Sequence, residues 1–197
     1  MSAPKILAFA GSTRTGSFNK KLIRGAADRA RAAGAEVTLI DLRDFPLPLF
    51  DGDLEDKEGL PENARKLKEL FRSHDALLIS APEYNSSITG VLKNTLDWVS
   101  RTETDDEPAL VAYRGKTAAL LAASPGALGG LRGLVHLRSI LGNIGVIVLP
   151  DQVAVPKAHE AFDDNGALKE ERTARQVRNV AESLVSFLKK HVETAVK

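Results

Sequence analysis

The 197-residue sequence contains no cysteine. This excludes disulfides, thiol nucleophiles, iron–sulfur clusters and thiolate zinc sites. An excess of charge is also lacking, because 27 Lys and Arg oppose 26 Asp and Glu. Without a basic surplus, we expect no nucleic-acid partner and no attraction to an anionic membrane. The four histidines lack the spacing of a metal-binding pair, so we expect no metal site.

Long apolar runs are missing as well. The first run, 6–10, has five residues and stops at Gly11. A signal peptide needs about 7–15 apolar residues and a membrane span about 20. We therefore expect a cytoplasmic protein with no membrane partner. No G-x-S-x-G elbow marks a nucleophilic serine, and no side chain stands out as a catalytic acid or base.

Short apolar runs alternate with segments of helical periodicity, and the length fits one domain over 1–197. The pattern predicts strands at 5–10, 37–40, 76–80, 116–123 and 145–149, and helices at 19–33, 61–71, 88–100, 131–141 and 168–190. Strands separated by helices indicate a parallel sheet covered on both faces. We predict an α/β flavodoxin-like three-layer sandwich, with a five-stranded parallel sheet in the order 2-1-3-4-5.

Two polar segments are assigned no chemistry. Residues 41–59 are rich in Pro, Asp and Gly, and we predict an exposed excursion there. Asp105, Asp106 and Glu107 are interpreted as a solvated face. Trp98 lies beside the apolar stripe of its helix, and we expect it in the core or in an interface.

Ligands of open parallel sheets bind beyond the carboxyl ends of the strands, where the strand order reverses. The loops after the first, third and fourth strands meet there, and they are the most unusual segments of the chain. The first, 11–19, combines two glycines, four hydroxyl side chains and Arg14 ahead of a helix N-terminus, a pattern typical of phosphate binding. The alternative is an ordinary capped strand-to-helix turn.

The other two loops each have two interpretations. Residues 81–90 place a proline, a tyrosine and polar residues at the exit of a strand. Such a loop can bind the edge of a planar heterocycle. The alternative is a simple polar loop in which Asn85 caps the next helix. Residues 124–130 are dense in glycine, which indicates close ligand approach or a flexible loop.

Two nucleotide motifs are excluded by their letters. Gly11 and Gly16 have the spacing of a Walker A loop, but Ser17 stands where the lysine is required. The dinucleotide fingerprint G-x-G-x-x-G is absent. An ATPase and a classical Rossmann dehydrogenase are therefore not expected.

The first loop, 11–19, together with 82–85 and the following 90–98, resembles the NADPH-dependent FMN reductase family, which includes quinone, chromate and azo-dye reductases. The resemblance extends over essentially the whole chain. It implies non-covalent FMN, with NADPH or NADH as co-substrate.

The resemblance also implies roles for individual residues. Its cofactor-binding positions are Ser12, Arg14, Ser17, Phe18 and Asn19 at the phosphate, Pro82, Glu83, Tyr84 and Asn85 along the isoalloxazine ring, mainly through the main chain, and Ser124 and Gly126 near the ring or ribityl chain.

The implied reaction is a ping-pong hydride transfer from NAD(P)H through FMN to a small-molecule acceptor such as a quinone, a flavin, chromate or an azo compound. A homodimer or homotetramer is implied too, with Tyr84 and Arg101 as interface candidates. One alternative is a flavodoxin-type electron carrier that does not oxidise NAD(P)H, although such carriers tend to be acidic and this chain is not. The other is a scaffold that lacks the flavin.

Overall fold

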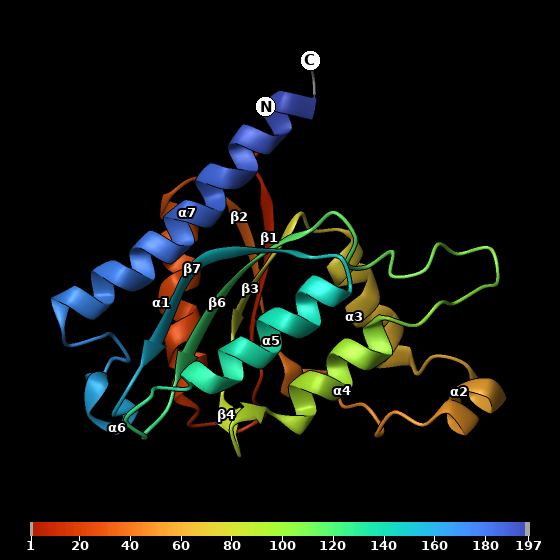
Figure 1. Cartoon of the computed structure of the whole chain (residues 1–197), viewed down its shortest axis with the longest axis horizontal. Coiled ribbons are helices and arrows are strands. Elements are labelled where there is room, and N and C mark those ends of the chain that lie inside the picture. The colour runs from red at the N-terminus through yellow and green to blue at the C-terminus, as the bar shows by residue number, and fades with distance from the viewer. Residues whose placement is uncertain (1, 196–197) are drawn as a thin grey trace.

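A five-stranded parallel sheet forms the middle layer of the molecule (Figure 1). The computed structural model describes residues 2–195. The strand order is β2-β1-β3-β6-β7, which confirms the predicted order of the five sheet strands. Their bounds are β1 Lys5–Ala10, β2 Glu36–Asp41, β3 Ala76–Ser80, β6 Thr117–Ala123 and β7 Ile147–Val155.

Helices cover both faces of this sheet (Figure 1). On one face lie α1 and α7, and on the other α3, α4 and α5. The bounds of these helices are α1 Phe18–Ala32, α3 Glu62–Arg72, α4 Gly90–Val99, α5 Leu131–Asn143 and α7 Glu171–Ala195. Within the part of the chain that the structure describes, no helix is both long and apolar enough to cross a membrane.

The alternation of side chains in β1 explains the two cores. Ile6 and Ala8 pack with α1 and α7, whereas Leu7 and Phe9 pack with α3 and α4. Successive side chains of a strand point to opposite faces, so a central strand with helices on both sides must be apolar throughout. These four residues are fully buried, and they fix the sheet between the two helical layers.

The structure departs from the predicted elements in one longer strand and in several short elements. The strand predicted at 145–149 continues to Val155, because β7 is an edge strand and accommodates Pro150 where its register against β6 shifts. Five short elements were not predicted. They are the 3₁₀ turn η1 Leu42–Asp44, helices α2 Gly52–Glu58 and α6 Ala158–Ala161, and the antiparallel hairpin of β4 Glu83–Tyr84 and β5 Ser87–Ile88.

The segment predicted as an exposed excursion is exposed over most of its length, but it also covers a small third core. Its side chains Leu47, Phe50 and Leu54 pack against the cluster that contains Trp98. The indole N–H of Trp98 donates to the carbonyl of Pro48 over 2.8 Å, and the centres of the Phe50 and Trp98 rings lie 5.0 Å apart in an edge-to-face arrangement. Trp98 is therefore a core residue, which confirms the first of the two expectations for it.

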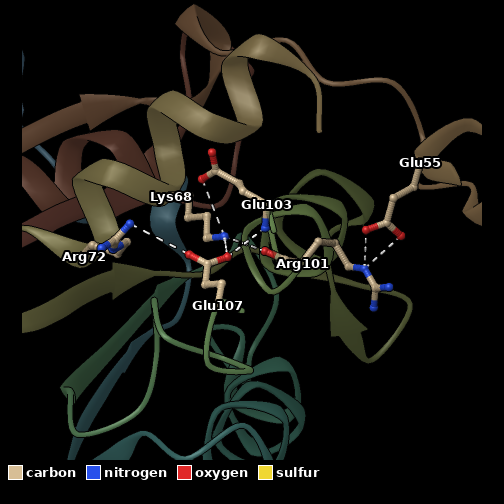
Figure 2. A network of polar contacts seen from close by, with 6 residues as sticks. All are labelled: Glu55, Lys68, Arg72, Arg101, Glu103 and Glu107. Carbon is tan, nitrogen blue, oxygen red and sulfur yellow. Dashed lines mark hydrogen bonds and ion pairs between the residues drawn. The ribbon is translucent and has the colours of Figure 1, made fainter. Parts of the chain in front are cut away.

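Figure 2 shows an ionic network that anchors the loop after α4. The ammonium of Lys68 on α3, whose side chain is 1% exposed, donates to Glu107 and to the carbonyl of Arg101. Arg101 in turn pairs with Glu55 of α2 over 2.7 Å. The interpretation of Glu107 as part of a solvated face is wrong, because its side chain is only 12% exposed. A lysine buried by the packing of α3 needs a counter-charge, and Glu107 supplies it.

Candidate functional site

The loop after β1 ends at a helix N-terminus with free donors. Ser17 is the N-cap of α1 with an extended backbone, but its hydroxyl makes no capping hydrogen bond. The N–H groups of Phe18 and Asn19 have no backbone acceptor within residues 2–195. Arg14 is exposed beside them in the same loop. Unengaged N–H groups, a free hydroxyl and a cation at a helix N-terminus together form an anion-binding arrangement.

Asn19 lies beneath this loop and connects it to two strand ends. Its side-chain oxygen accepts from the Ser80 hydroxyl over 2.8 Å and from the N–H of Ala123 over 3.0 Å. Its amide nitrogen donates to the carbonyl of Ala123 over 2.8 Å. Because Ser80 ends β3 and Ala123 ends β6, this one buried side chain brings the roots of all three candidate loops together. Any contact of Asn19 with a phosphate would therefore come chiefly from its backbone N–H.

Two further side chains hold the first candidate loop, and neither was predicted from the sequence to belong to the site. Arg43, which follows β2, donates through Nε to the carbonyl of Thr13 over 2.8 Å. Thr89 donates its hydroxyl to the carbonyl of Gly11 over 2.7 Å and accepts from the N–H of Leu92 as the N-cap of α4. A polar residue just ahead of a helix was the available signal for Thr89, whereas no local pattern marks Arg43.

Replacing Thr89 with valine is expected to lower the free energy of unfolding by about 1–2 kcal/mol. The substitution keeps the shape but removes the cap of α4 and leaves the buried carbonyl of Gly11 unpaired. Urea unfolding of the cofactor-free protein measures the loss. Thr102→Val is the control at an exposed threonine, and equal stability of the two variants would contradict the assigned role of Thr89.

The second candidate loop folds as a tight hairpin. Asn85 and Ser86 have φ values of +49° and +67°, which is the conformation of a two-residue type I′ turn. The interpretation of Asn85 as a helix cap is therefore wrong, since Thr89 occupies that position. Pro82 is buried at the exit of β3, and Tyr84 is 60% exposed. The hairpin places Tyr84 and the backbone of 82–85 at the carboxyl edge of the sheet.

The carboxylate of Glu83 turns toward α5. It pairs with Arg132 and accepts from the N–H groups of Arg132 and Gly133 over 3.0 and 3.2 Å. Burial by itself raises the pKa of Glu83, but the hydrogen bonds and charge of Arg132 and the N–H of Gly133 outweigh it. The pKa consequently lies below its ordinary value of 4.5, and the group is ionised near neutral pH.

The third candidate loop is closed by the end of β7. Ser124 donates its N–H to the carbonyl of Val155 over 3.1 Å, and its hydroxyl accepts from the N–H of Gly126. A Cβ on Gly129 would lie 2.7 Å from the backbone at Val155 and Pro156, so only glycine fits there. The glycine density of this loop thus serves close approach between two backbone segments, while Gly126 itself is exposed.

The structure thus brings the predicted residues of all three loops to one edge of the sheet, the lower edge in Figure 1 where β4 and α6 lie. Arg101, an interface candidate, lies apart from the three loops, pairs with Glu55, and lies 5.5 Å from the centre of the Phe50 ring. Among the described residues, no cluster of histidine, aspartate and glutamate is arranged to hold a metal ion.

Comparison with known proteins gives a consistent family. Residues 4–160 match the NADPH-dependent FMN reductase family. The chain is 33% identical over 187 residues to an NAD(P)H-dependent FMN reductase of Pseudomonas aeruginosa, covering 94% of this chain and 96% of the relative. It is 36% identical over 145 residues to a quinone reductase of Escherichia coli K12, covering 74% and 73%. The flavoenzyme NAD(P)H:(acceptor) oxidoreductase of Paracoccus denitrificans superposes with a TM-score of 0.80 at 27% identity, covering 96% and 99%.

Proposed function

The chain belongs to the NADPH-dependent FMN reductase family, and from this we propose that it transfers hydride from NAD(P)H through FMN to quinones or similar acceptors by a ping-pong mechanism. It is an oxidoreductase with FMN as cofactor and NAD(P)H as co-substrate. The observation that carries the proposal is the unengaged N-terminus of α1 beside Arg14.

The residues of the first loop fit an FMN phosphate. The hydroxyls of Ser12 and Ser17, the guanidinium of Arg14, and the N–H groups of Phe18 and Asn19 would hold it. Hydrogen bonds from charged or preorganised donors to phosphate oxygens are the strong ones, and a helix N-terminus favours negative charge. The fold holds these donors in place through Asn19 and Thr89, so the loop requires little ordering when the phosphate binds.

We propose that the backbone of Pro82, Glu83, Tyr84 and Asn85 lines the isoalloxazine ring, with Ser124 and Gly126 beside the ring or the ribityl chain. The buried Pro82 stiffens the start of the hairpin, and the type I′ turn shapes its end. The exposed Tyr84 offers an aromatic surface to the ring or to a second subunit. We further propose one domain over 1–197 and a homodimer or homotetramer in the cytoplasm.

When bound, FMN supplies the two-electron redox chemistry, and the protein supplies binding and orientation. The three loops would hold the cofactor at the carboxyl edge of the sheet, and in the proposed mechanism NAD(P)H and the acceptor would use one open face of the ring in turn. Sharing one face accounts for the missing dinucleotide fingerprint. None of the proposed cofactor-binding residues is assigned as an acid, and solvent could supply the proton that quinone reduction needs.

An anaerobic titration tests this function. Adding NADPH to the FMN-reconstituted protein should bleach the visible flavin band, and a later addition of quinone should restore it. Initial rates at several concentrations of both substrates should give parallel double-reciprocal lines, because the first product leaves before the acceptor binds. Intersecting lines would exclude the ping-pong order. Bound flavin that NADPH cannot bleach would indicate an electron carrier. A protein that takes up no FMN would indicate a scaffold.

A further inference from the structure

Helix α5 begins without a capping side chain of its own. Its N-cap residue is Gly130 in the left-handed conformation, with φ at +96°. A Cβ there would lie 2.8 Å from the Cβ of Ala122, so the Ser, Thr, Asp or Asn that usually caps a helix does not fit. The first N–H groups of α5 must therefore find acceptors elsewhere.

Glu83 supplies the missing acceptor from the hairpin. Its Oε2 accepts from the N–H groups of Arg132 and Gly133, the second and third residues of α5. Its Oε1 accepts from Nε of Arg132 over 2.8 Å and from the Nη2 atom of the same side chain. A carboxylate in this position gains from the helix dipole as well as from the arginine.

The hairpin needs this attachment because it is small. Its two strands have two residues each, and an isolated two-stranded hairpin is marginal in water. Besides Glu83, the described residues of the hairpin make one other side-chain hydrogen bond to α5, where the Ser87 hydroxyl meets Nδ1 of His136 at 2.9 Å. Ile88 adds apolar packing, since it lies in the same buried cluster as Leu134 of α5. A Cβ on Gly133 would lie 3.2 Å from the carbonyl of Ser87, so the hairpin lies directly against the helix.

The direction of Glu83 also decides the direction of its neighbour. Successive side chains of an extended strand point to opposite sides. Since the Glu83 side chain is only 8% exposed and faces α5, Tyr84 faces away and is 60% exposed. The attachment thus sets which backbone and side-chain groups of 82–85 are presented at the sheet edge.

We propose that Glu83, Arg132 and the N–H of Gly133 form a positioning clamp that holds the hairpin in the geometry that binds the isoalloxazine ring. Arg132 acts in it as a positioning residue that does not contact the cofactor. The location of the ring rests on the proposed function. The clamp joins the second candidate loop to the helix that follows the third, so that both loops reach the ring as one preorganised surface.

Two variants separate the parts of the clamp. Arg132→Gln removes the ion pair but leaves the Glu83 carboxylate as the cap of α5. Glu83→Ala removes the ion pair and the cap together. We expect the Kd for FMN, measured by quenching of flavin fluorescence, to rise about tenfold in the first and about a hundredfold in the second. The visible circular dichroism band of bound FMN should weaken in both, because the ring is held less firmly. Arg132→Lys should give a smaller rise in Kd, since a point charge replaces a forked donor.

The Arg132 side chain is 56% exposed, so Arg132→Gln is expected to fold even if Glu83→Ala does not. Arg175→Gln, an exposed arginine of α7 on the opposite face of the sheet, is the charge-matched control. If Arg132→Gln binds FMN like the wild-type protein and shows the same dichroism band, the clamp is overturned and the proposed function stands. A wild-type protein that takes up no FMN would overturn the proposed function and the clamp with it.

Discussion

Replacing Glu107 with glutamine is expected to lower the free energy of unfolding by about 3 kcal/mol. The substitution leaves the ammonium of Lys68, which is 1% exposed, without its main counter-charge (Figure 2). Glu103 at 3.5 Å and the carbonyl of Arg101 at 2.8 Å remain, so the loss falls at the lower end of the range for a broken buried pair. Urea unfolding of the cofactor-free protein at pH 7 measures it.

The stability that Glu107 contributes is also expected to depend on pH. Burial by itself raises the pKa of Glu107, but hydrogen bonds from Lys68 and the N–H of Glu103, with the charges of Lys68 and Arg72, hold it below its ordinary value of 4.5. A depressed carboxylate pKa contributes stability above the unfolded-state pKa, and that stability disappears as the pH falls through the folded-state pKa. The stability difference between wild type and Glu107→Gln should therefore be full at pH 7 and shrink below about pH 4.5.

Two controls test whether the loss comes from the buried charge. The double variant Lys68→Met with Glu107→Gln removes both charges and should recover most of the stability, because no unpaired ion stays buried. Glu58→Gln breaks an exposed pair with Lys57 and should change stability by less than about 0.5 kcal/mol. If Glu107→Gln is no less stable than Glu58→Gln, Lys68 does not depend on Glu107.

Replacing both Arg14 and Ser17 with alanine is expected to weaken FMN binding by a factor of about 100 or more. Each charge-assisted hydrogen bond to a phosphate contributes roughly 1.5–3 kcal/mol, and about 1.4 kcal/mol is tenfold in Kd. Titration of the cofactor-free protein with FMN, followed by flavin fluorescence, gives the Kd. Riboflavin, which lacks the phosphate, should bind the variant and the wild type about equally.

The cofactor-free form of this variant should keep its stability. The Ser17 hydroxyl makes no capping bond to α1, so its removal takes no internal hydrogen bond from the helix. Arg24→Ala, an exposed arginine further along α1, is the charge-matched control and should leave the Kd unchanged. An unaltered FMN Kd in the double variant would exclude the first loop as the phosphate site.

Much of the fold followed from local patterns. The apolar runs predicted all five sheet strands, because a central parallel strand must be buried on both faces. The number and spacing of the strands predicted their order. The short elements could not be predicted in this way. The hairpin of β4 and β5 depends on α5, and α2 depends on Trp98 and Arg101, which are distant in sequence.

The candidate site, too, was predictable only where its chemistry is local in sequence. The glycines, hydroxyls and Arg14 of the first loop already indicated phosphate binding, because that chemistry is local to one strand-to-helix turn. Local sequence did not distinguish the side chains that face the ligand from those that support the loops. Asn19 and Glu83 have the right chemistry to touch a cofactor, but their side chains bond to strand ends and to a helix N-terminus.

By itself, the sequence determined the layered α/β architecture and the three loops that meet at one sheet edge, since periodicity and glycine placement act over a few residues. Only the tertiary structure decided that Glu107 neutralises Lys68 and that Glu83 caps α5. Each of those assignments depends on a partner about 40 or more residues away. Each interaction is needed only because packing has buried a charge or removed the space for a local cap.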